Sequence, residues 1–153
     1  MRPLFIGQAP GPGAKSFDER ALGGRCGARL ALLAGLPNVS ALLDIVDTRN
    51  VFDAFPGRAE RKGDRFPHAE ARPRAQTILA EERDREVIVF VGLAVAAAFA
   101  FTEPPCVWRR IAIPRRALGV VPHPSGVNTW YNDPANVDIA RRFLREAVKA
   151  FAP

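Results

Sequence analysis

The sequence has few of the residues on which several classes of protein depend. Its 153 residues include only two cysteines, Cys26 and Cys106, which are far apart in the chain. Metal or iron–sulfur sites with four cysteine ligands are therefore excluded, and we expect two reduced thiols. The longest apolar run, residues 87–101, is too short to cross a bilayer about 30 Å thick, and no long apolar segment follows Met1. We therefore expect a cytoplasmic protein with no membrane partner.

Lysine is scarce as well, so arginine supplies most of the positive charge. The chain has 3 lysines and 19 arginines against 16 acidic residues, which gives a net charge of +6. Because the guanidinium group binds phosphate in a planar, bidentate manner, one interpretation is a polyanionic partner. The other is a GC-rich genome, which favours arginine codons. The charge alone does not decide between them.

The order of apolar segments predicts the fold. Short apolar runs predict strands at residues 4–6, 42–46, 87–91 and 120–121. Helical patterns predict helices at residues 25–36, 75–83 and 93–101, and a last helix that starts at Pro134 and is capped by Asp133. We therefore expect a single α/β domain over residues 1–153: a three-layer sandwich with a four-stranded, mainly parallel sheet and helices on both faces. Residues 57–76 lack an apolar period and predict a long exposed loop, or a loop with one short turn, which either faces DNA or is an idle solvated segment.

In an open parallel sheet, the loops after the strands meet at one edge, where ligands bind. Here these loops are residues 7–13, residues 47–57, the segment from Gly92 onward, and residues 122–128. Three of these four loops have the most unusual local sequences in the chain. We therefore expect the functional site at this edge.

The first loop suggests a phosphate-binding loop, because residues 7–16 have the sequence Gly-Gln-Ala-Pro-Gly-Pro-Gly-Ala-Lys-Ser. A P-loop places lysine directly after its last glycine. Here Ala14 comes before Lys15 and would put a Cβ into a backbone nest that favours glycine. An enzyme that binds nucleotides through a P-loop-like segment stays open as an alternative, and so does a plain structural turn.

The last loop places His123 between Pro122 and Pro124. Because proline restricts the backbone on both sides, the imidazole has little entropy left to lose. A rigid imidazole at this edge suits the stabilisation of negative charge on a leaving group, and the alternative is a histidine that caps a turn.

Asn50 lies at the same edge, and its amide donates and accepts hydrogen bonds at once, which suits a pyrimidine edge. The alternative for Asn50 is an ordinary turn residue.

Taken together, the motifs resemble those of the uracil-DNA glycosylase superfamily. They are Gln8-Ala9-Pro10-Gly11 after the first strand, Asn50-Val51-Phe52 before Pro56-Gly57-Arg58, and His123-Pro124-Ser125 after the last strand, with Gly24-Arg25-Cys26-Gly27 between the first two. They are most similar to bacterial members whose first motif is Gly-Glu-Ala-Pro-Gly, and the resemblance covers nearly the whole chain. It implies a uracil-DNA glycosylase-like fold. It also implies a monofunctional enzyme that flips uracil out of DNA and hydrolyses its N-glycosidic bond, the first step of base-excision repair.

The resemblance also implies roles for single residues. His123 would hydrogen-bond the uracil O2 and stabilise the departing anion, Asn50 would recognise the uracil edge, and Gln8 would help to hold the attacking water. The other implied substrate-binding residues are Gly7, Ala9, Pro10 and Gly11 in the pocket wall. The implied DNA-binding residues are Ser125 and Gly126 at the backbone, with Val127 and Asn128 in the segment that enters the gap left by the flipped base.

The chain departs from the family pattern in three respects. Gln8 stands where those bacterial members have glutamate, and Ala9 stands where other families have aspartate or asparagine, so no carboxylate is evident as the activator of water. The stacking aromatic of the family falls at Leu22, for which Phe17 and Phe52 are the candidate replacements. The four cluster cysteines of the iron–sulfur members are missing. We expect no metal and no cofactor, and a monomer whose partner is uracil-containing DNA, single- or double-stranded. A non-catalytic relative that binds uracil or DNA is a further alternative.

Overall fold

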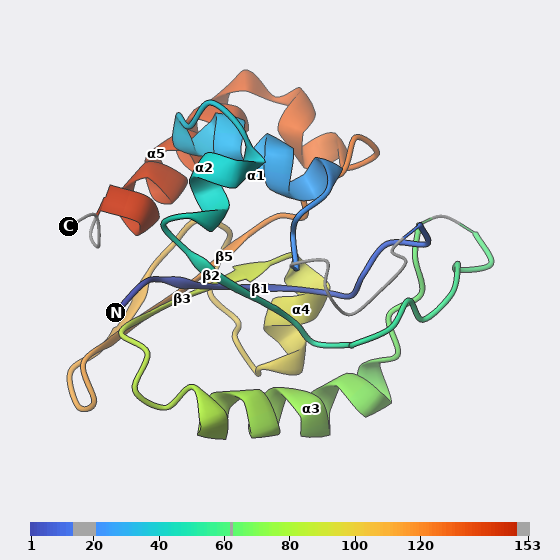
Figure 1. Ribbon diagram of the computed structural model, residues 1–153, viewed down its shortest axis with the longest axis horizontal. Coiled ribbons are helices and arrows are strands. Elements are labelled where there is room, and N and C mark those ends of the chain that lie inside the picture. The colour runs from blue at the N-terminus through green and yellow to red at the C-terminus, as the bar shows by residue number, and fades with distance from the viewer. Residues whose placement is uncertain (14–20, 62, 150–153) are drawn as a thin grey trace.

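The computed structural model of the chain describes residues 1–13, 21–61 and 63–149 (Figure 1). Strands and helices alternate along most of these residues, so the predicted α/β class is confirmed. The elements are β1 (Leu4–Gly7), α1 (Arg25–Ala34), α2 (Val39–Leu43), β2 (Asp47–Asn50), α3 (His68–Glu81), β3 (Val87–Val91), α4 (Leu93–Ala98), β4 (Arg109–Ile111), β5 (Arg116–Val121), a 3₁₀ helix (Thr129–Asn132) and α5 (Pro134–Lys149).

The strands form one five-stranded sheet in the order β2-β1-β3-β5-β4. The first four of these are parallel to one another, whereas β4 pairs antiparallel with β5. The prediction of four strands is therefore wrong by one. The missed strand, β4, has three residues and two of them are arginines, so no apolar run marks it in the sequence. Its pairing with β5, rather than its composition, makes it a strand.

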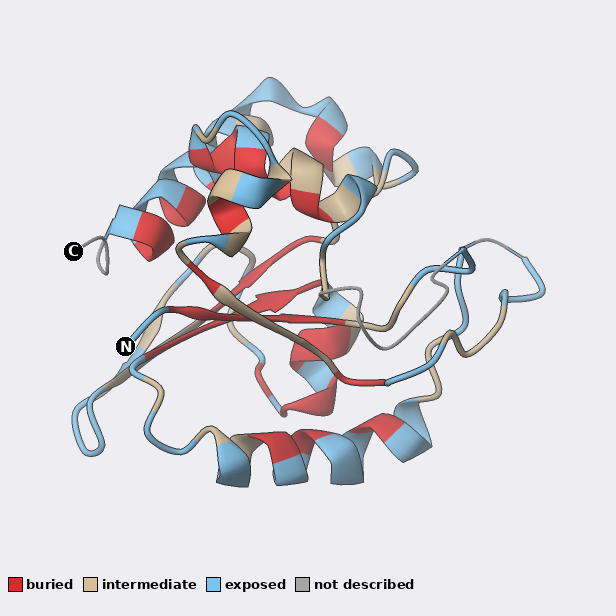
Figure 2. Cartoon of the chain, in the orientation of Figure 1, coloured by how far each residue is buried: buried red, intermediate tan, exposed pale blue. Residues whose placement is uncertain are grey.

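Helices cover both faces of the sheet: α1, α2 and α5 lie on one side, and α3 and α4 lie on the other (Figure 1). Because successive strand residues point to opposite faces, β1 and β3 each supply both cores. Phe5 and Val89 are buried under α1 and α5, whereas Ile6 and Phe90 pack against α3 and α4. Figure 2 shows the buried strands between the two helical layers. Within the described chain, no charged or polar residue is buried.

The predicted final helix is confirmed, together with its cap. α5 begins at Pro134, and the Ala135 N–H donates to Asp133 Oδ1 at 2.9 Å. Its buried face consists of the apolar residues that recur at helical spacing in the sequence, of which Phe143 is the largest: Ala140, Phe143, Leu144, Ala147 and Val148. Phe151, which the sequence pattern also places on this face, lies outside the described residues.

The second strand was predicted at the wrong residues. The apolar run 42–46 is not a strand, because its first residues belong to α2 and the strand β2 is the polar segment Asp47–Asn50. α2 starts locally, since the Asn38 side chain accepts a hydrogen bond from the Ala41 N–H at 3.0 Å. β2 is an edge strand, so it does not need an apolar residue on each face.

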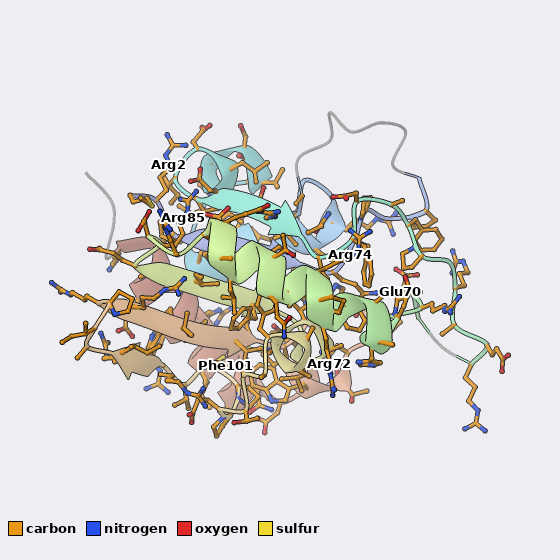
Figure 3. The ribbon with its side chains drawn as sticks, turned by 90° about the horizontal axis from the view of Figure 1, so that it is seen from below. Arg2, Glu70, Arg72, Arg74, Arg85 and Phe101 are labelled. Atoms are coloured by element: carbon orange, nitrogen blue, oxygen red, sulfur yellow. The ribbon has the colours of Figure 1, made fainter. Side chains whose placement is uncertain are left out.

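The loop predicted at residues 57–76 is also wrong in its second half. α3 begins at His68 and contains Pro73, a residue that normally disfavours a helix interior. The helix buries Ala71, Ala75 and Ile78, which are spaced four and three residues apart and form a narrow apolar stripe. Packing of this stripe on the sheet outweighs the local cost of the proline. Figure 3 views this face, with Glu70, Arg72 and Arg74 on the helix.

Ion pairs line both edges of the sheet. On β2, Arg49 lies 2.5 Å from Glu81 and 3.4 Å from Glu82, both at the end of α3. On β4, Arg110 lies 3.0 Å from Glu146 of α5. Such exposed pairs contribute little energy one by one. They do connect each edge strand to the helix that covers its neighbours.

Among the helices that the structure describes, none is long and apolar enough to cross a membrane.

Substitution of Phe5 by alanine tests the central packing. Phe5 has no exposed surface, so Phe5→Ala removes a buried ring and leaves a cavity. We expect the free energy of unfolding to fall by about 3–5 kcal/mol, measured by urea denaturation. The control Ile113→Ala, at a side chain that is 91% exposed, is expected to change it by less than about 0.5 kcal/mol. A loss below about 1 kcal/mol in Phe5→Ala would contradict the central position of β1.

Candidate active site

Residues from three strands meet at the carboxyl edge of the sheet. Gly7 ends β1 and Asn50 ends β2, and the two are direct partners in the parallel register. His123 comes two residues after Val121, the last residue of β5. The segments after β1 and β2 both leave from the same side of the sheet (Figure 1). The predicted convergence of these loops is therefore present.

The lack of a side chain at Gly7 lets the Asn50 side chain approach the end of β1. A Cβ at residue 7 would lie 2.7 Å from Asn50 Oδ1 and 3.0 Å from Cδ2 of Leu22. Leu22 is half-buried, with a left-handed backbone at φ +61°. An amide and an apolar side chain thus lie side by side next to Gly7, and the apolar one is at the position where the family resemblance places a stacking aromatic.

His123 is half-buried, and its ring contacts Cys26 in the first turn of α1. The distance from His123 Nε2 to Cys26 Sγ is 3.6 Å. Burial lowers the pKa of His123 below its usual 6.5, while the negative charge of Asp64 acts in the opposite direction. Burial also raises the pKa of the Cys26 thiol. At pH 7 a neutral imidazole therefore faces a neutral thiol.

Side chains hold the backbone on both sides of the imidazole. The Tyr131 hydroxyl donates to the Pro122 carbonyl at 2.5 Å, in a buried contact. Asn128 Nδ2 donates to the carbonyl of His123 itself at 2.9 Å. Asn128 Oδ1 accepts from the Trp130 N–H at 3.1 Å, so both ends of this amide are engaged within the loop. The expected DNA-binding residue Asn128 thus has a structural role in the free protein.

Arg29 of α1 holds the next two carbonyls. Its Nη1 donates to the Ser125 carbonyl at 3.1 Å and lies 3.5 Å from the Pro124 carbonyl. The guanidinium also lies over the Tyr131 ring, 4.8 Å from its centroid. Together with Tyr131 and Asn128, Arg29 engages four consecutive carbonyls, those of residues 122–125. We call these three side chains the carbonyl clamp.

The amide groups of the same loop remain open. The N–H groups of Ser125, Gly126 and Val127 donate to no described residue. Gly126 is exposed, with no atom within 4 Å of the place a Cβ would take, and Val127 is 57% exposed. Unpaired backbone N–H groups next to a glycine form a surface that a phosphate oxygen can approach.

The other predicted site residues lie in three different settings. The Gln8 side chain is half-buried and donates from Nε2 to the Arg65 carbonyl at 3.2 Å. Phe52 is only 5% exposed and its ring packs edge-on against Phe66, so it is a core residue and not an open stacking surface. Phe17 lies outside the described residues, as do Lys15 and Ser16. The remaining residues of the first loop are the half-buried Ala9 and Pro10 and the exposed Gly11.

Three residues of the site were missed by sequence analysis: Arg29, Tyr131 and Asp64. Arg29 lies three residues after Cys26 on α1, so helical spacing would have placed both on one face. Tyr131 is the single tyrosine of the chain and has no motif around it. Asp64 belongs to the segment taken for an exposed loop, and only the folded structure brings its charge near His123.

A cavity of about 350 Å³ lies at the opposite edge, beside the first residues of β3 and β5. Part of its polar lining is engaged within the chain: Arg110 pairs with Glu146, and Arg116 donates to the carbonyls of Arg85 and Glu82. None of the predicted site residues lines it. In the described part of the chain, no group of three or more His, Cys, Asp or Glu residues is placed to hold a metal ion.

No protein-family model matches this chain, and no curated protein matches its sequence.

The titration of His123 tests the burial of its ring. We expect a pKa below 6.5, measured by NMR from the ring nitrogen shifts, with His68→Gln used to assign the two histidines. Because the unfolded chain then binds this proton more readily than the folded one, the free energy of unfolding should fall as the pH drops below 6.5. A His123 pKa at or above 6.5 would contradict the half-buried imidazole.

Removal of the Tyr131 hydroxyl tests the carbonyl clamp. Tyr131→Phe leaves the buried Pro122 carbonyl without its donor, so we expect a loss of about 1–3 kcal/mol in the free energy of unfolding. The control Ser40→Ala removes an exposed hydroxyl and should change it by less than about 0.5 kcal/mol. Equal effects of the two substitutions in chemical denaturation would show that the Tyr131 hydroxyl does not hold the loop.

Proposed function

We propose that this chain is a DNA glycosylase of uracil-DNA glycosylase-like fold that hydrolyses the N-glycosidic bond of uracil in DNA. The observation that carries the proposal is that His123 and the paired residues Gly7 and Asn50 lie at the same edge of one sheet, at the carboxyl ends of parallel strands. The motif resemblance requires these three positions to come together, although they lie more than 40 residues apart along the chain. The parallel sheet brings them to one edge, as the motif order requires.

The state of His123 suits stabilisation of a leaving group. When the bond to uracil breaks, negative charge develops on the base, and a donor held at its O2 lowers the energy of that charge. A neutral imidazole has one N–H to donate and does not need to lose a proton first. In the free protein, Nε2 faces the Cys26 sulfur at 3.6 Å, which is a weak partner. A carbonyl oxygen of a bound base can replace this contact at little cost.

The surroundings of Asn50 suit a pyrimidine edge. Its amide offers one donor and one acceptor, which match the O4 and N3–H of uracil. The missing side chain at Gly7 lets this amide lie against the end of β1, and Leu22 supplies an apolar neighbour. These features support recognition of a small planar base with hydrogen bonds along one edge.

The loop after His123 suits the DNA backbone. The open N–H groups of Ser125, Gly126 and Val127 can bind phosphate oxygens, and the net charge of +6 favours a polyanion. The exposed Val127 side chain is placed beside these amides and can fill the space that a flipped base leaves. Flipping costs a few kcal/mol, least at a mismatch or in a single strand.

A cleavage assay tests the proposal. A labelled oligonucleotide with one deoxyuridine, single-stranded or opposite guanine or adenine, is incubated with excess protein and then treated with alkali. We expect cleavage at uracil and none at thymine in the same position. His123→Ala should lower the rate by roughly 100-fold or more, because one donor to the developing anion is lost. The control His68→Ala, at an exposed histidine on α3, should stay within about twofold of the wild type.

The absence of cleavage at uracil with the wild-type protein in excess would overturn the proposal. Binding of deoxyuridine-containing DNA in that case, stronger than binding of the thymidine control, would favour the non-catalytic relative. Protection against thermal unfolding by nucleoside triphosphate with magnesium, lost in Lys15→Ala, would favour the P-loop-like alternative.

A further inference from the structure

A carboxylate that has no role in the motif resemblance lies beside the candidate site. Asp64 belongs to a short two-stranded turn between β2 and α3, in which Arg58 and Asp64 are antiparallel bridge partners. Two backbone hydrogen bonds, of 3.0 and 2.9 Å, flank this pair. We call the described residues of 57–65 the Asp64 hairpin. The hairpin holds Asp64 by its backbone, so its side chain is not needed for the turn.

The hairpin is attached to the first loop of the site. The Gln8 side chain donates from Nε2 to the carbonyl of Arg65, the residue next to Asp64, at 3.2 Å. Gln8 directly follows Gly7, which is paired with Asn50. Asp64 therefore lies on the side of the site that is formed by the ends of β1 and β2. His123 lies on the other side, after the end of β5.

The charge of Asp64 reaches both ionisable groups on that opposite side. Burial lowers the pKa of His123 and the charge of Asp64 opposes this change, whereas burial raises the pKa of Cys26 and the charge of Asp64 adds to it; no other carboxylate among the described residues acts on either group. This agrees with the geometry, in which the bond from Gln8 to the Arg65 carbonyl places the neighbouring Asp64 beside the first loop of the site. Its side chain is exposed and forms no hydrogen bond or ion pair with a described residue, so it is free to bind water.

The proposed reaction lacks such a group. Hydrolysis of a glycosidic bond requires a water molecule to reach the sugar carbon, and a carboxylate near that carbon orients the water and accepts its proton. In the first loop, the two positions where related enzymes have a polar or acidic residue are Gln8 and Ala9, and neither is a carboxylate. Gln8 instead binds the backbone of the Asp64 hairpin.

We propose that Asp64 supplies the water-activating carboxylate of this enzyme, brought to the site by the hairpin that Gln8 holds in place. The proposal rests on the proposed uracil excision. The bond between the sugar C1′ and uracil N1 breaks, and its electron pair leaves with the base, which His123 stabilises. The water oxygen bonds to C1′ and keeps one proton as the new hydroxyl group, while its other proton passes to the Asp64 carboxylate and then to solvent. The negative charge of Asp64 also stabilises the positive charge that develops on the sugar.

A matched pair of variants tests this role. Asp64→Asn removes the carboxylate at nearly constant shape, and Glu60→Gln makes the same change of charge at another exposed position of the hairpin. Under single-turnover conditions, we expect Asp64→Asn to excise uracil roughly 100-fold more slowly than wild type, the usual contribution of a general base. Glu60→Gln should remain within about twofold. Formate should restore part of the activity of Asp64→Ala and none of that of His123→Ala.

A second measurement tests the placement of Asp64 without any activity. Loss of the negative charge removes the contribution that raises the pKa of His123, so Asp64→Asn should lower the His123 pKa in an NMR titration. Glu60→Gln should leave it unchanged. An unchanged His123 pKa in Asp64→Asn would overturn the proposal, whether or not the protein excises uracil.

The kinetic outcomes separate this proposal from the proposed function. If wild type excises uracil and His123→Ala does not, but Asp64→Asn is as fast as Glu60→Gln, the role of Asp64 is overturned and the glycosylase function stands. If the wild-type protein releases no base, the glycosylase function and the role of Asp64 are both overturned. A slow Asp64→Asn variant with a normal unfolding curve and a lowered His123 pKa would support both.

Discussion

The carbonyl clamp is the constraint on which the candidate site depends. The loop after β5 has two prolines and one glycine, so no regular hydrogen-bond ladder continues through it. Arg29, Asn128 and Tyr131 take the place of that ladder by bonding the carbonyls of residues 122–125 one after another. Because the carbonyls are held in this way, the imidazole has a fixed backbone and the following N–H groups stay open.

The clamp also explains why the site is spread over so many segments. Arg29 belongs to α1, whose first turn supplies Cys26, so one helix both supports the loop and contacts the imidazole. Tyr131 belongs to the short helix that leads into α5. α1 packs against α5 in the core on that side of the sheet. This packing therefore sets the position of Arg29 relative to Tyr131. A substitution deep in this core can change the orientation of His123 without touching it.

The sequence was informative where local pattern decides the structure. The run at β3 is apolar at every position, and the capped, one-sided pattern of α5 has few alternatives, so both were predicted correctly. These elements, together with β1, were enough to predict the edge of the sheet at which Gly7, Asn50 and His123 lie. Where pairing decides, the pattern failed. β2 is polar and β4 is mostly arginine, and each is a strand because a neighbouring strand offers it hydrogen bonds.

The same reason hid part of the site. Asp64 and Gln8 are more than 50 residues apart, and their relation depends on how a turn without apolar residues folds back on the first loop. Arg29 could have been placed on the face of Cys26 by helical spacing, but its carbonyl partners are about 95 residues further along the chain. Contacts of this range leave no trace in the composition or period of a single sequence.

The two polar edge strands affect how copies of the chain meet. An exposed strand edge is a template on which another chain can add a strand, and long apolar edges promote aggregation. Here β2 and β4 have four and three residues, and their arginines are paired with carboxylates of the same chain. A second copy that extended the sheet would gain only a few backbone hydrogen bonds and would have to pack beside these charged side chains. The strands that are hardest to find in the sequence thus protect the apolar centre of the sheet from self-association.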